Sequence, residues 1–450
     1  MTPATAQAQT AQTAPPHQAY VDEFAAGKWA KRGPGFVREA RSQAMLAFTK
    51  AGFPSTREEA WKHTSVREIA RTHFRPVTTP ARSLAEAEVA PYRIPGAVEV
   101  VFVDGHHVSG LSLAPDLPDG VIVQPLSAAM AKPSEELELH LARHAGDDPF
   151  VALNTAFFQD GALVAVAPGV ALAHPVHILH LSTEPHAPTA SHVRNLLLFG
   201  AGCEALVVES YVGLPSGDAS LTTAVTELVA GPGAQVRHVK LQRENLHAFH
   251  LGRLAIRQDR DAVVQDLLFS VGAALSRNEV EGILGGQGAE VRLGGLFLGT
   301  GRQHVDCTTR IEHAVPHTTS RELYKGVLDG AAHGVFLGNV KVQARAAKTF
   351  AEQTNRNLLL STQAAVDTTP QLEIHNDDVK CSHGSTIGQL SKDALFFLRS
   401  RGIGEEQSRL LLTQAFAHEV IESAPTPLRL LLEGLLTQWF ACRKVQGAMQ

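Results

Sequence analysis

The chain has 450 residues, of which 44% are hydrophobic and 19% are charged, and its formal net charge is −5 at neutral pH. This length predicts about two to four domains, and the composition is typical of a soluble globular protein. No long basic run occurs, so the sequence gives no indication that it binds nucleic acid or a membrane surface.

The N-terminus and the cysteines predict a cytoplasmic protein. Residues 1–18 are rich in Ala, Thr, Gln and Pro and lack the basic start and apolar centre of a signal peptide, so we expect a disordered tail there. No run of about 18 uninterrupted apolar residues occurs, which argues against a transmembrane helix. The four cysteines, Cys203, Cys307, Cys381 and Cys442, lie far apart, as reduced thiols do in a cytoplasmic protein.

Residues 19–95 form a predicted N-terminal helical region. Apolar or small side chains recur every four residues at Phe36, Ala40, Ala44 and Phe48, and the pattern ends near Gly52. Ser55 and Glu58 have the spacing of a capping box before Trp61, which predicts that a second helix begins there.

Residues 96–380 form a predicted β-rich core. Short apolar or alternating runs occupy 98–103, 162–166, 196–199, 205–208, 236–241, 263–269, 291–293 and 335–337. Small-residue turns separate them at 168–169, 200–202, 231–233, 286–288 and 330–331, and the turn glycines Gly169, Gly202 and Gly233 are spaced 33 and 31 residues apart. Short strands turned at this interval favour stacked β-coils. A β-sandwich or a pair of barrels remains an alternative, because Asp-Gly dipeptides of the kind found in hairpins also occur.

Residues 381–450 form a predicted C-terminal helical domain. Ser391 can cap a helix that ends near Gly402, and a second helix is expected from about Glu405 to Glu422. The third carries an apolar stripe made of Leu428, Leu431, Leu432, Leu435, Leu436, Trp439 and Phe440. Such a stripe either packs against its own domain or docks on another protein, and the pattern leaves both open.

Sequence motifs of common enzymes are absent. The chain has no phosphate-binding P-loop, no dinucleotide-binding glycine pattern between a strand and a helix, no nucleophile elbow and no His-Glu-x-x-His. Histidines gather at 174, 177 and 180 and at 304, 313 and 317, but their spacing matches no recurrent metal site, and we expect structural roles for them. His177 and His180 should face opposite sides of one strand.

The stretch from Asp377 to Thr386 is the strongest chemical signal. It places Cys381 two residues from His383, after Asp377 and Asp378. Thiolate and imidazole are ligands for iron and zinc, and Lys380 or a bound cation would favour the thiolate form of Cys381. Cys-x-His is half of a site, since most such metals take three or four ligands. The others must come from elsewhere in the fold or from a partner.

The residues around this motif resemble a known family. Residues 372–390 together with 394–403 closely resemble the C-terminal signature of the SufB/SufD family of iron–sulfur cluster assembly scaffold subunits. Cys381-Ser382-His383-Gly384 stands where the SufB branch has an acid–His–acid stretch, so the resemblance is to the SufD branch. Residues 52–54, 61–64, 343–344 and 349–361 also look like the family.

The resemblance implies a fold and a function. The fold is a right-handed parallel β-helix between N- and C-terminal helical regions. The function is that of a non-catalytic scaffold that pairs with a SufB-type subunit through the β-helix end, while its C-terminal helices hold a SufC-type ABC ATPase. The resemblance also places His383 and Cys381 as metal ligands at the SufB–SufD interface, where iron enters and a nascent cluster forms.

The resemblance also gives expectations for cofactors, oligomeric state and interface residues. No cofactor is expected on this chain alone, but transient iron or an iron–sulfur cluster is expected to be shared with the SufB-type subunit, and a flavin in the complex and a homodimer are left open. The predicted interface residues are Asp378, Lys380, Leu428, Leu432, Leu435 and Trp439. The alternatives are a β-helix enzyme acting on polysaccharide and a purely structural partner without metal ligation.

Overall fold

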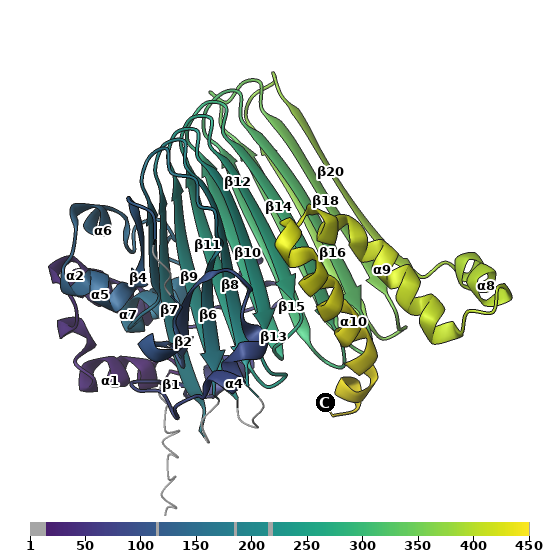
Figure 1. Cartoon of the computed structure of the whole chain (residues 1–450), viewed down its shortest axis with the longest axis horizontal. Helices are drawn as coiled ribbons and strands as arrows, with labels where there is room; N and C mark the ends of the chain where they lie inside the picture. Colours follow the sequence, from purple (N-terminus) through teal and green to yellow (C-terminus); the bar gives the residue numbers. More distant parts are fainter. Residues whose placement is uncertain (1–14, 114–116, 184–186, 215–218, 450) are drawn as a thin grey trace, which may run out of the picture.

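The computed structural model describes residues 15–113, 117–183, 187–214 and 219–449, with side chains up to residue 443. It is a long β-solenoid with helices at both ends (Figure 1). The sequence-based expectation of a parallel β-helix between two helical regions is therefore confirmed. The expected disordered tail falls mostly outside the described residues, and the first helix begins at Gln18, the last residue assigned to that tail.

Two sheets make up the solenoid. In one, the strands run β4 (Val121–Pro125), β5 (Ala162–Val166), β7 (Thr189–Phe199), β9 (Ser220–Ala230), β11 (Phe249–Gln258), β13 (Leu275–Leu284), β15 (His304–His313), β17 (His333–Val342) and β19 (Ala365–Ile374), with β1 (Arg75–Pro76) beside β7. In the other they run β3 (His106–His107), β2 (Val98–Val103), β6 (Val176–Ser182), β8 (Glu204–Gly213), β10 (Gln235–Arg243), β12 (Val263–Ser270), β14 (Glu290–Gly299), β16 (Thr319–Leu328), β18 (Phe350–Leu359) and β20 (Lys380–Gln389). From β5 onward, consecutive strands alternate between the two sheets.

Each coil of the solenoid repeats after about thirty residues. Glu204 pairs with Gln235, 31 residues later, and Val263 pairs with Glu290, 27 residues later, both in parallel register. At one corner the turns stack through backbone hydrogen bonds, such as that from the Gly202 amide to the Pro232 carbonyl at 2.8 Å. Gly202 has a φ of 64°, in the left-handed region that glycine adopts without strain. The small-residue turns are therefore the solenoid corners that their spacing predicted.

The Asp-Gly dipeptides, which in the sequence suggested hairpins, occupy two different kinds of turn. Asp104 and Gly105 join β2 to β3 in a true antiparallel hairpin, both with positive φ. Asp329 and Gly330 instead form a corner between two parallel strands, where the Gly330 φ is 64°. The sandwich or barrel alternative is therefore wrong, since one real hairpin lies at the start of the solenoid and the later Asp-Gly pair serves a corner.

Helices of the N-terminal part cover the outside of the solenoid. They are α1 (Gln18–Ala26), η1 (Trp29–Lys31), α2 (Gly35–Ala51), η2 (Glu59–Trp61), α3 (Arg67–Arg71), α4 (Glu86–Val89), η3 (Ala90–Tyr92), η4 (Ser109–Leu111), α5 (Leu126–Ala131), α6 (Glu135–His140) and α7 (Pro149–Phe157). Val89 and Leu111 of the short helices pack on the sheet that contains β2, β6 and β8, and the larger helices lie on the sheet that contains β7 to β13. Aromatic side chains of this region, including Trp61 and Phe150, form one buried cluster with outward-facing Phe249 and Leu251 of β11. The hydrophobic effect of this burial fixes the N-terminal region on the solenoid.

The content and the end of the core differ from the sequence-based expectation. Residues 96–380 contain α5, α6 and α7 as well as strands, and strand β20 continues to Gln389, beyond the expected end of the core at 380. Helix α7 forms because the Asp148 carboxylate accepts a hydrogen bond from the Phe150 amide at 2.9 Å and Pro149 occupies the first helical turn. The Ser55 amide does bond Glu58 at 2.8 Å, but only the short 3₁₀ turn η2 follows.

The C-terminal helices are α8 (Lys392–Ser400), α9 (Glu405–Ser423) and α10 (Thr426–Met449). As predicted, the Ser391 hydroxyl caps α8 by accepting a hydrogen bond from the Ala394 amide at 3.2 Å. Helices α9 and α10 lie on the outer face of the sheet that ends in β20, whereas α8 projects away from the body (Figure 1). Among the described residues, no helix is long and apolar enough to cross a bilayer.

Candidate functional site

The solenoid ends in two edge strands that are open on one side. β19 and β20 are the terminal strands of their sheets, and each pairs with a single long neighbour, β17 and β18 respectively. Nearly every residue of β20 is exposed, and β19 is exposed or half-buried throughout. An edge strand presents unpaired backbone N–H and C=O groups that can pair with another chain. We call the exposed edge of β19 and β20 the end face.

The Cys-x-His motif lies in this end face. Cys381 pairs with Ala351 of β18, and His383 pairs with Gln353. Their side chains project to the same side of the strand because they are two residues apart. The motif was expected where the core gives way to helices, but it belongs to a regular strand and has the fixed geometry that a strand gives.

Cys381 is half-buried at the end of the apolar interior. It packs beside Val342, Ala346 and Ala351, and this burial raises the pKa of its thiol above the ordinary value. The expectation that Lys380 favours the thiolate is therefore not met in the chain by itself. A thiol with a raised pKa binds a metal only when the metal or a new neighbour displaces its proton.

His383 is exposed, as are the charged residues that precede it. The Lys348 ammonium forms an ion pair with Asp378 at 2.8 Å across the last corner, and the Lys380 amide donates to the Thr349 carbonyl at 2.9 Å. These contacts hold the start of β20 in place. Within the described part of the chain, no group of three or more His, Cys, Asp or Glu side chains is placed to hold a metal ion.

A row of polar side chains runs through the solenoid behind His383. Residues paired from strand to strand at this inward position are His238, Asp266, Leu293, Glu322, Gln353 and His383. Glu322 is fully buried, and burial raises the pKa of its carboxyl to about 7. His383 is thus the exposed last member of a largely polar interior row. Sequence reasoning missed this row because it becomes visible only once the repeat of about thirty residues is known.

Further inside, the same row contains a charged group. Burial by itself would lower the pKa of His238, but hydrogen bonds to Asp266 and Glu209 raise it to about 9. The imidazole lies 2.6 Å from an Asp266 oxygen and 3.2 Å from a Glu209 oxygen. This arrangement is a compensated buried ion triad, and removal of one member would leave an uncompensated charge in the interior.

The apolar stripe of α10 packs within the chain. Leu428 and Leu432 are 1% exposed and Trp439 is 3% exposed, and they lie against the outer face of the solenoid. Leu435 is partly buried against the same cluster. The expectation that this stripe docks a partner is therefore corrected: of the two alternatives that the pattern left open, packing against the chain itself is the one observed.

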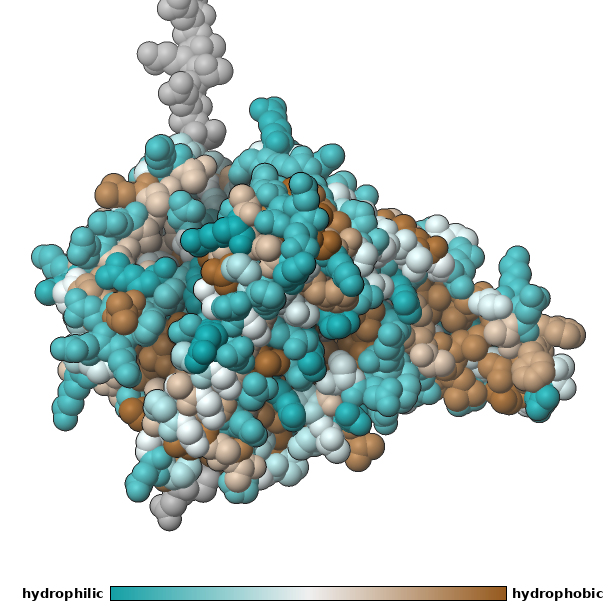
Figure 2. Space-filling model, turned by 90° about the horizontal axis from the view of Figure 1, so that it is seen from above, coloured by the Kyte–Doolittle hydropathy of each residue, from teal (hydrophilic) through white to brown (hydrophobic). Residues whose placement is uncertain are grey.

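Helix α8 instead presents the exposed apolar surface. Phe396 is 75% exposed and Phe397 is 53% exposed, and no residue of α8 is buried. Figure 2 shows apolar side chains gathered on the projecting end of the molecule, where α8 lies in Figure 1. Large aromatic side chains exposed together on a projecting helix are typical of a protein-binding surface.

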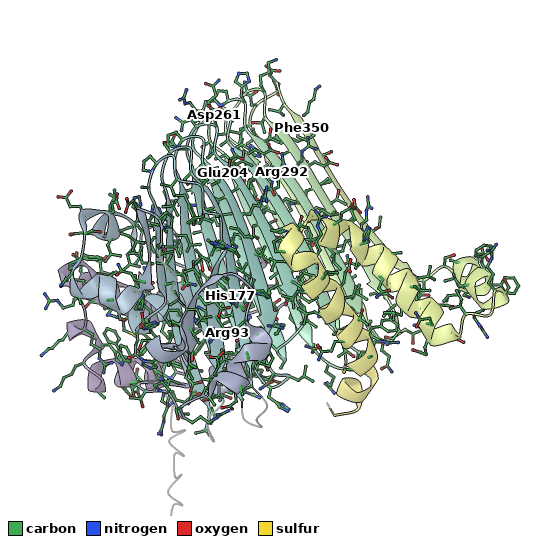
Figure 3. All side chains as sticks on the ribbon, viewed as in Figure 1. Arg93, His177, Glu204, Asp261, Arg292 and Phe350 are labelled. Carbon is green, nitrogen blue, oxygen red and sulfur yellow. The ribbon has the colours of Figure 1, made fainter. Side chains whose placement is uncertain are left out.

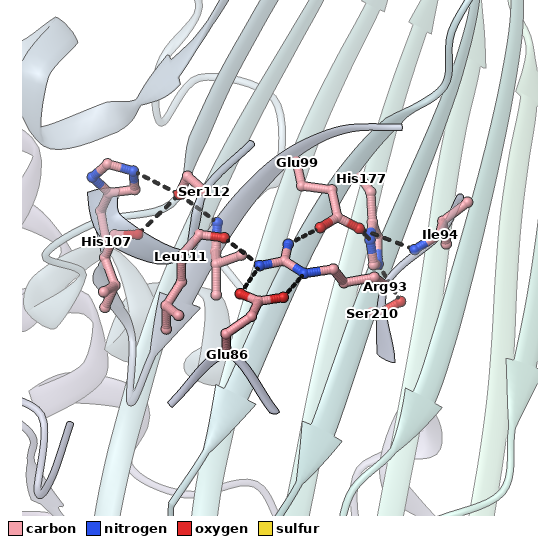
Figure 4. Close-up of polar contacts among 11 residues, drawn as sticks. Glu86, Arg93, Ile94, Glu99, His107, Leu111, Ser112, His177 and Ser210 are labelled. Atoms are coloured by element: carbon pink, nitrogen blue, oxygen red, sulfur yellow. Dashed lines mark hydrogen bonds and ion pairs between the residues drawn. The ribbon is translucent and has the colours of Figure 1, made fainter. Parts of the chain in front are cut away.

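Four histidines of the other two clusters make side-chain contacts inside the fold. His177 and His180 face opposite sides of β6. The two ring nitrogens of His177 form hydrogen bonds of 2.8 Å with Glu99 and with Ser210. His180 stacks between the rings of Phe102 and Tyr211. Figure 4 shows how Arg93 holds Glu99 from the other side. This closed network joins the N-terminal segment to the first coils.

The second cluster is similarly closed. His304 bonds the Thr64 hydroxyl at 2.9 Å, which ties the N-terminal region to β15, and His313 bonds Thr318 and Ser320 inside the solenoid. Cys307 is fully buried, and burial raises the pKa of its thiol. His304 and His313 therefore have their hydrogen-bond partners within the chain.

Comparison with known proteins gives a consistent result. A family model described as the SufBD core domain of the SUF system for FeS cluster assembly matches residues 180–416, and one described as the SufBD protein N-terminal region matches residues 17–178. An iron–sulfur cluster assembly SufBD family protein of Synechocystis sp. is 32% identical over 402 residues, which cover 87% of this chain and 88% of the relative.

Two further relatives match over a similar extent. The iron–sulfur cluster assembly protein SufD of Escherichia coli is 30% identical over 398 residues, which cover 86% of this chain and 90% of the relative. The chloroplastic protein ABCI7 of Arabidopsis thaliana is 29% identical over 402 residues, which cover 86% and 82% of the two chains.

Proposed function

The chain belongs to the SufBD family of iron–sulfur cluster assembly proteins, and we propose that it acts there as a SufD-type scaffold that pairs with a SufB-type subunit through its end face. The family assignment removes the reason to consider a polysaccharide-acting enzyme. The exposed His383 and the half-buried Cys381 on the end face are the observation that carries the proposal. We place this role in the cytoplasm, as the cysteine pattern predicts.

The open edges support pairing with another solenoid. Strands β19 and β20 have ten residues each, and no strand among the described residues pairs with their open side. A second solenoid presenting matching edge strands would continue both sheets and satisfy the backbone groups. A partner that is itself a SufBD-type solenoid fits this surface, and a second copy of this chain is the competing occupant.

Pairing would complete the half site for iron. His383 offers an exposed imidazole on the end face, and Cys381 offers a thiol at the rim of the apolar interior. Ligands from the partner would raise the count to the three or four that iron and its clusters use. In this proposal His383 is the primary ligand, because its side chain is exposed, whereas Cys381 must first lose a proton that burial retains.

The exposed aromatic face of α8 is the proposed docking surface for the ATPase subunit. Helices α9 and α10 use their apolar side chains to hold the C-terminal domain on the solenoid, and α8 is left projecting with Phe396 and Phe397 uncovered. A SufC-type ATPase bound there would apply force to the C-terminal domain, and α9 and α10 would transmit that force to the strands next to the end face. The chain supplies the scaffold and the ATPase supplies the energy.

The iron content of the assembled complex tests the proposed ligand. The chain is co-expressed with its SufB-type and SufC-type partners, and iron per complex is measured for wild type, His383→Ala and Ser382→Ala. Ser382 is the matched control because it lies on the same strand and projects to the opposite side. We expect His383→Ala to assemble normally but to lose most of its iron, with Ser382→Ala at the wild-type value.

Two results would contradict the proposal. Equal iron in the His383→Ala and Ser382→Ala complexes would leave His383 as a packing residue, the purely structural alternative. If the chain purifies without either partner, or only as a homodimer, the proposal that it pairs with a SufB-type subunit is wrong.

A further inference from the structure

A groove of about 480 Å³ opens on the outer face of the sheet that ends in β20. It lies between strands β10 to β18 and the turn that joins α9 to α10, and Figure 3 shows Arg292 on this face above that turn. Its volume is in the range of small-molecule sites. The groove opens on the outer face of the sheet and reaches β18, the strand next to the end face, and the proposed scaffold role makes no use of it.

A row of arginines lines the groove. Arg237, Arg292 and Arg321 lie in register on β10, β14 and β16, with Gln265 of β12 between the first two. Adjacent strands are about 4.8 Å apart, so these three positions span about 14 Å across the sheet. The Arg292 and Arg321 side chains are about half exposed, which leaves their guanidinium groups accessible to a ligand.

The charges of this row are only partly neutralised. Arg292 bonds Glu290 of its own strand at 2.6 Å, and Arg321 lies 3.4 Å from Glu352. Arg237 forms no hydrogen bond or ion pair with any residue that the structure describes. Like charges on neighbouring strands repel each other, so an anion bound across the row would remove this repulsion.

The rest of the rim adds little negative charge. Arg356 is 3.4 Å from Glu419, and the same Glu419 oxygen is 2.7 Å from the Lys325 ammonium, so two cations share this carboxylate. Pro425 lines the groove, and helix α10 begins at the next residue, Thr426. The N-terminus of α10 therefore adds the positive end of its helix dipole to the rim of the groove. The lining residues Asp266 and Glu322 occupy inward positions and belong to the interior row described above.

A slot in the floor lies next to the arginines. Leu267, Gly294 and Leu323 are paired across β12, β14 and β16, two residues along from the arginine row on the same face. Because Gly294 has no side chain, the floor is lowest there, with Leu267 closing one side and Leu323, Val420 and Pro425 lining the rest of the slot. A Cβ at Gly294 would come within 3.0 Å of a Leu267 methyl carbon.

We propose that this groove binds a nucleoside polyphosphate. The slot accepts the edge of a flat apolar ring beside Leu323 and Pro425. Arg292 and Arg321 hold the phosphates through paired N–H donors, with Arg237 next in the row. Arginine suits phosphate because its planar fork donates two parallel hydrogen bonds. Inorganic phosphate alone would leave the apolar slot unused.

Binding of ADP and of inorganic pyrophosphate to the purified full-length chain tests the proposal, since no ATPase subunit is present to bind the nucleotide. We expect ADP to bind more tightly than pyrophosphate in calorimetric titrations. Arg292→Gln should weaken both at least tenfold, because it removes a charge-assisted pair of hydrogen bonds. Gly294→Leu should weaken ADP at least tenfold and leave pyrophosphate unchanged, because it fills only the slot.

Arg260→Gln is the matched control, an exposed arginine at a corner outside the groove, and it should bind as wild type. Circular dichroism and the melting temperature establish that each variant is folded. The proposal is overturned if ADP does not bind at millimolar concentration, or if Arg292→Gln or Gly294→Leu binds ADP as tightly as wild type does. Tighter binding of a glutamate-rich peptide than of ADP would also overturn it and make the groove a protein-docking site.

Discussion

The buried carboxyl of Glu322 should make the stability of the solenoid depend on pH. Its side chain lies inside the solenoid on β16, where the Thr309 hydroxyl donates a hydrogen bond to Oε2 at 2.6 Å. Burial raises the pKa of this carboxyl from 4.5 to about 7. Glu322→Gln keeps the shape and the oxygen that accepts from Thr309, and it removes the ionisation.

The sign and size of the effect follow from linkage. Since the folded state holds the proton more tightly than the unfolded state, the stability that Glu322 contributes is complete below pH 4.5 and is lost as the pH rises through about 7. At 1.36 kcal/mol for each pH unit by which the pKa moves, the loss amounts to about 3 kcal/mol. The Gln variant does not suffer this loss. It should equal wild type near pH 4.5 and exceed its free energy of unfolding by about 3 kcal/mol at pH 8.

Urea unfolding at pH 5, 6, 7 and 8, followed by circular dichroism, measures this difference. Other titrating groups contribute equally to both proteins, so they cancel when the variant is compared with wild type. Glu352→Gln, an outward-facing and half-exposed carboxyl on the neighbouring strand, is the control and should show no trend with pH. A difference between Glu322→Gln and wild type that stays constant from pH 5 to pH 8 would refute the reasoning.

Three further outcomes are expected. Trp439→Ala should lower the free energy of unfolding by about 3 kcal/mol or more, because it opens a cavity between α10 and the solenoid, whereas exposed Leu430→Ala on the same helix should cost at most about 0.5 kcal/mol in the same urea experiment. Burial alone would raise the pKa of Glu209, but its hydrogen bonds, first of all from His238, hold it at about 2. The stabilisation is therefore present above pH 4.5 and lost as the pH falls through 2, so Glu209→Gln should be about 3 kcal/mol less stable at pH 6 and equal to wild type near pH 2. Phe396→Ser should leave the melting temperature unchanged but abolish retention of the ATPase subunit in a pull-down.

The repeat and the corners of the solenoid could be predicted because they depend on local chemistry. Gly202 and Gly233 recur where the chain must adopt positive φ, and their spacing is the length of one coil. The strands were predicted too short because several inward positions are polar. Glu209 and Thr226, for instance, interrupt the apolar alternation of β8 and β9, yet they bond each other inside the solenoid at 2.7 Å.

The role of the C-terminal stripe could not be predicted because periodicity shows that a helix has an apolar face and not what covers it. Leu428 and Trp439 have the spacing of a docking surface, but they pack on the solenoid. The exposed aromatic side chains are on α8, which is short and less apolar overall. Cys381 and His383 were found directly from the sequence, whereas the polar row behind His383 required the strand register.

Hydrogen–deuterium exchange at the end face tests the central claim most directly. In the chain alone, no strand of the described ranges pairs with the open side of β20 (Lys380–Gln389), so the amides on that side should exchange quickly. When the SufB-type subunit is added, we expect strong protection of β19 and β20 and no change in interior strands such as β12. A stable complex in which β19 and β20 exchange as fast as in the free chain would contradict the claim that the subunits pair through this end.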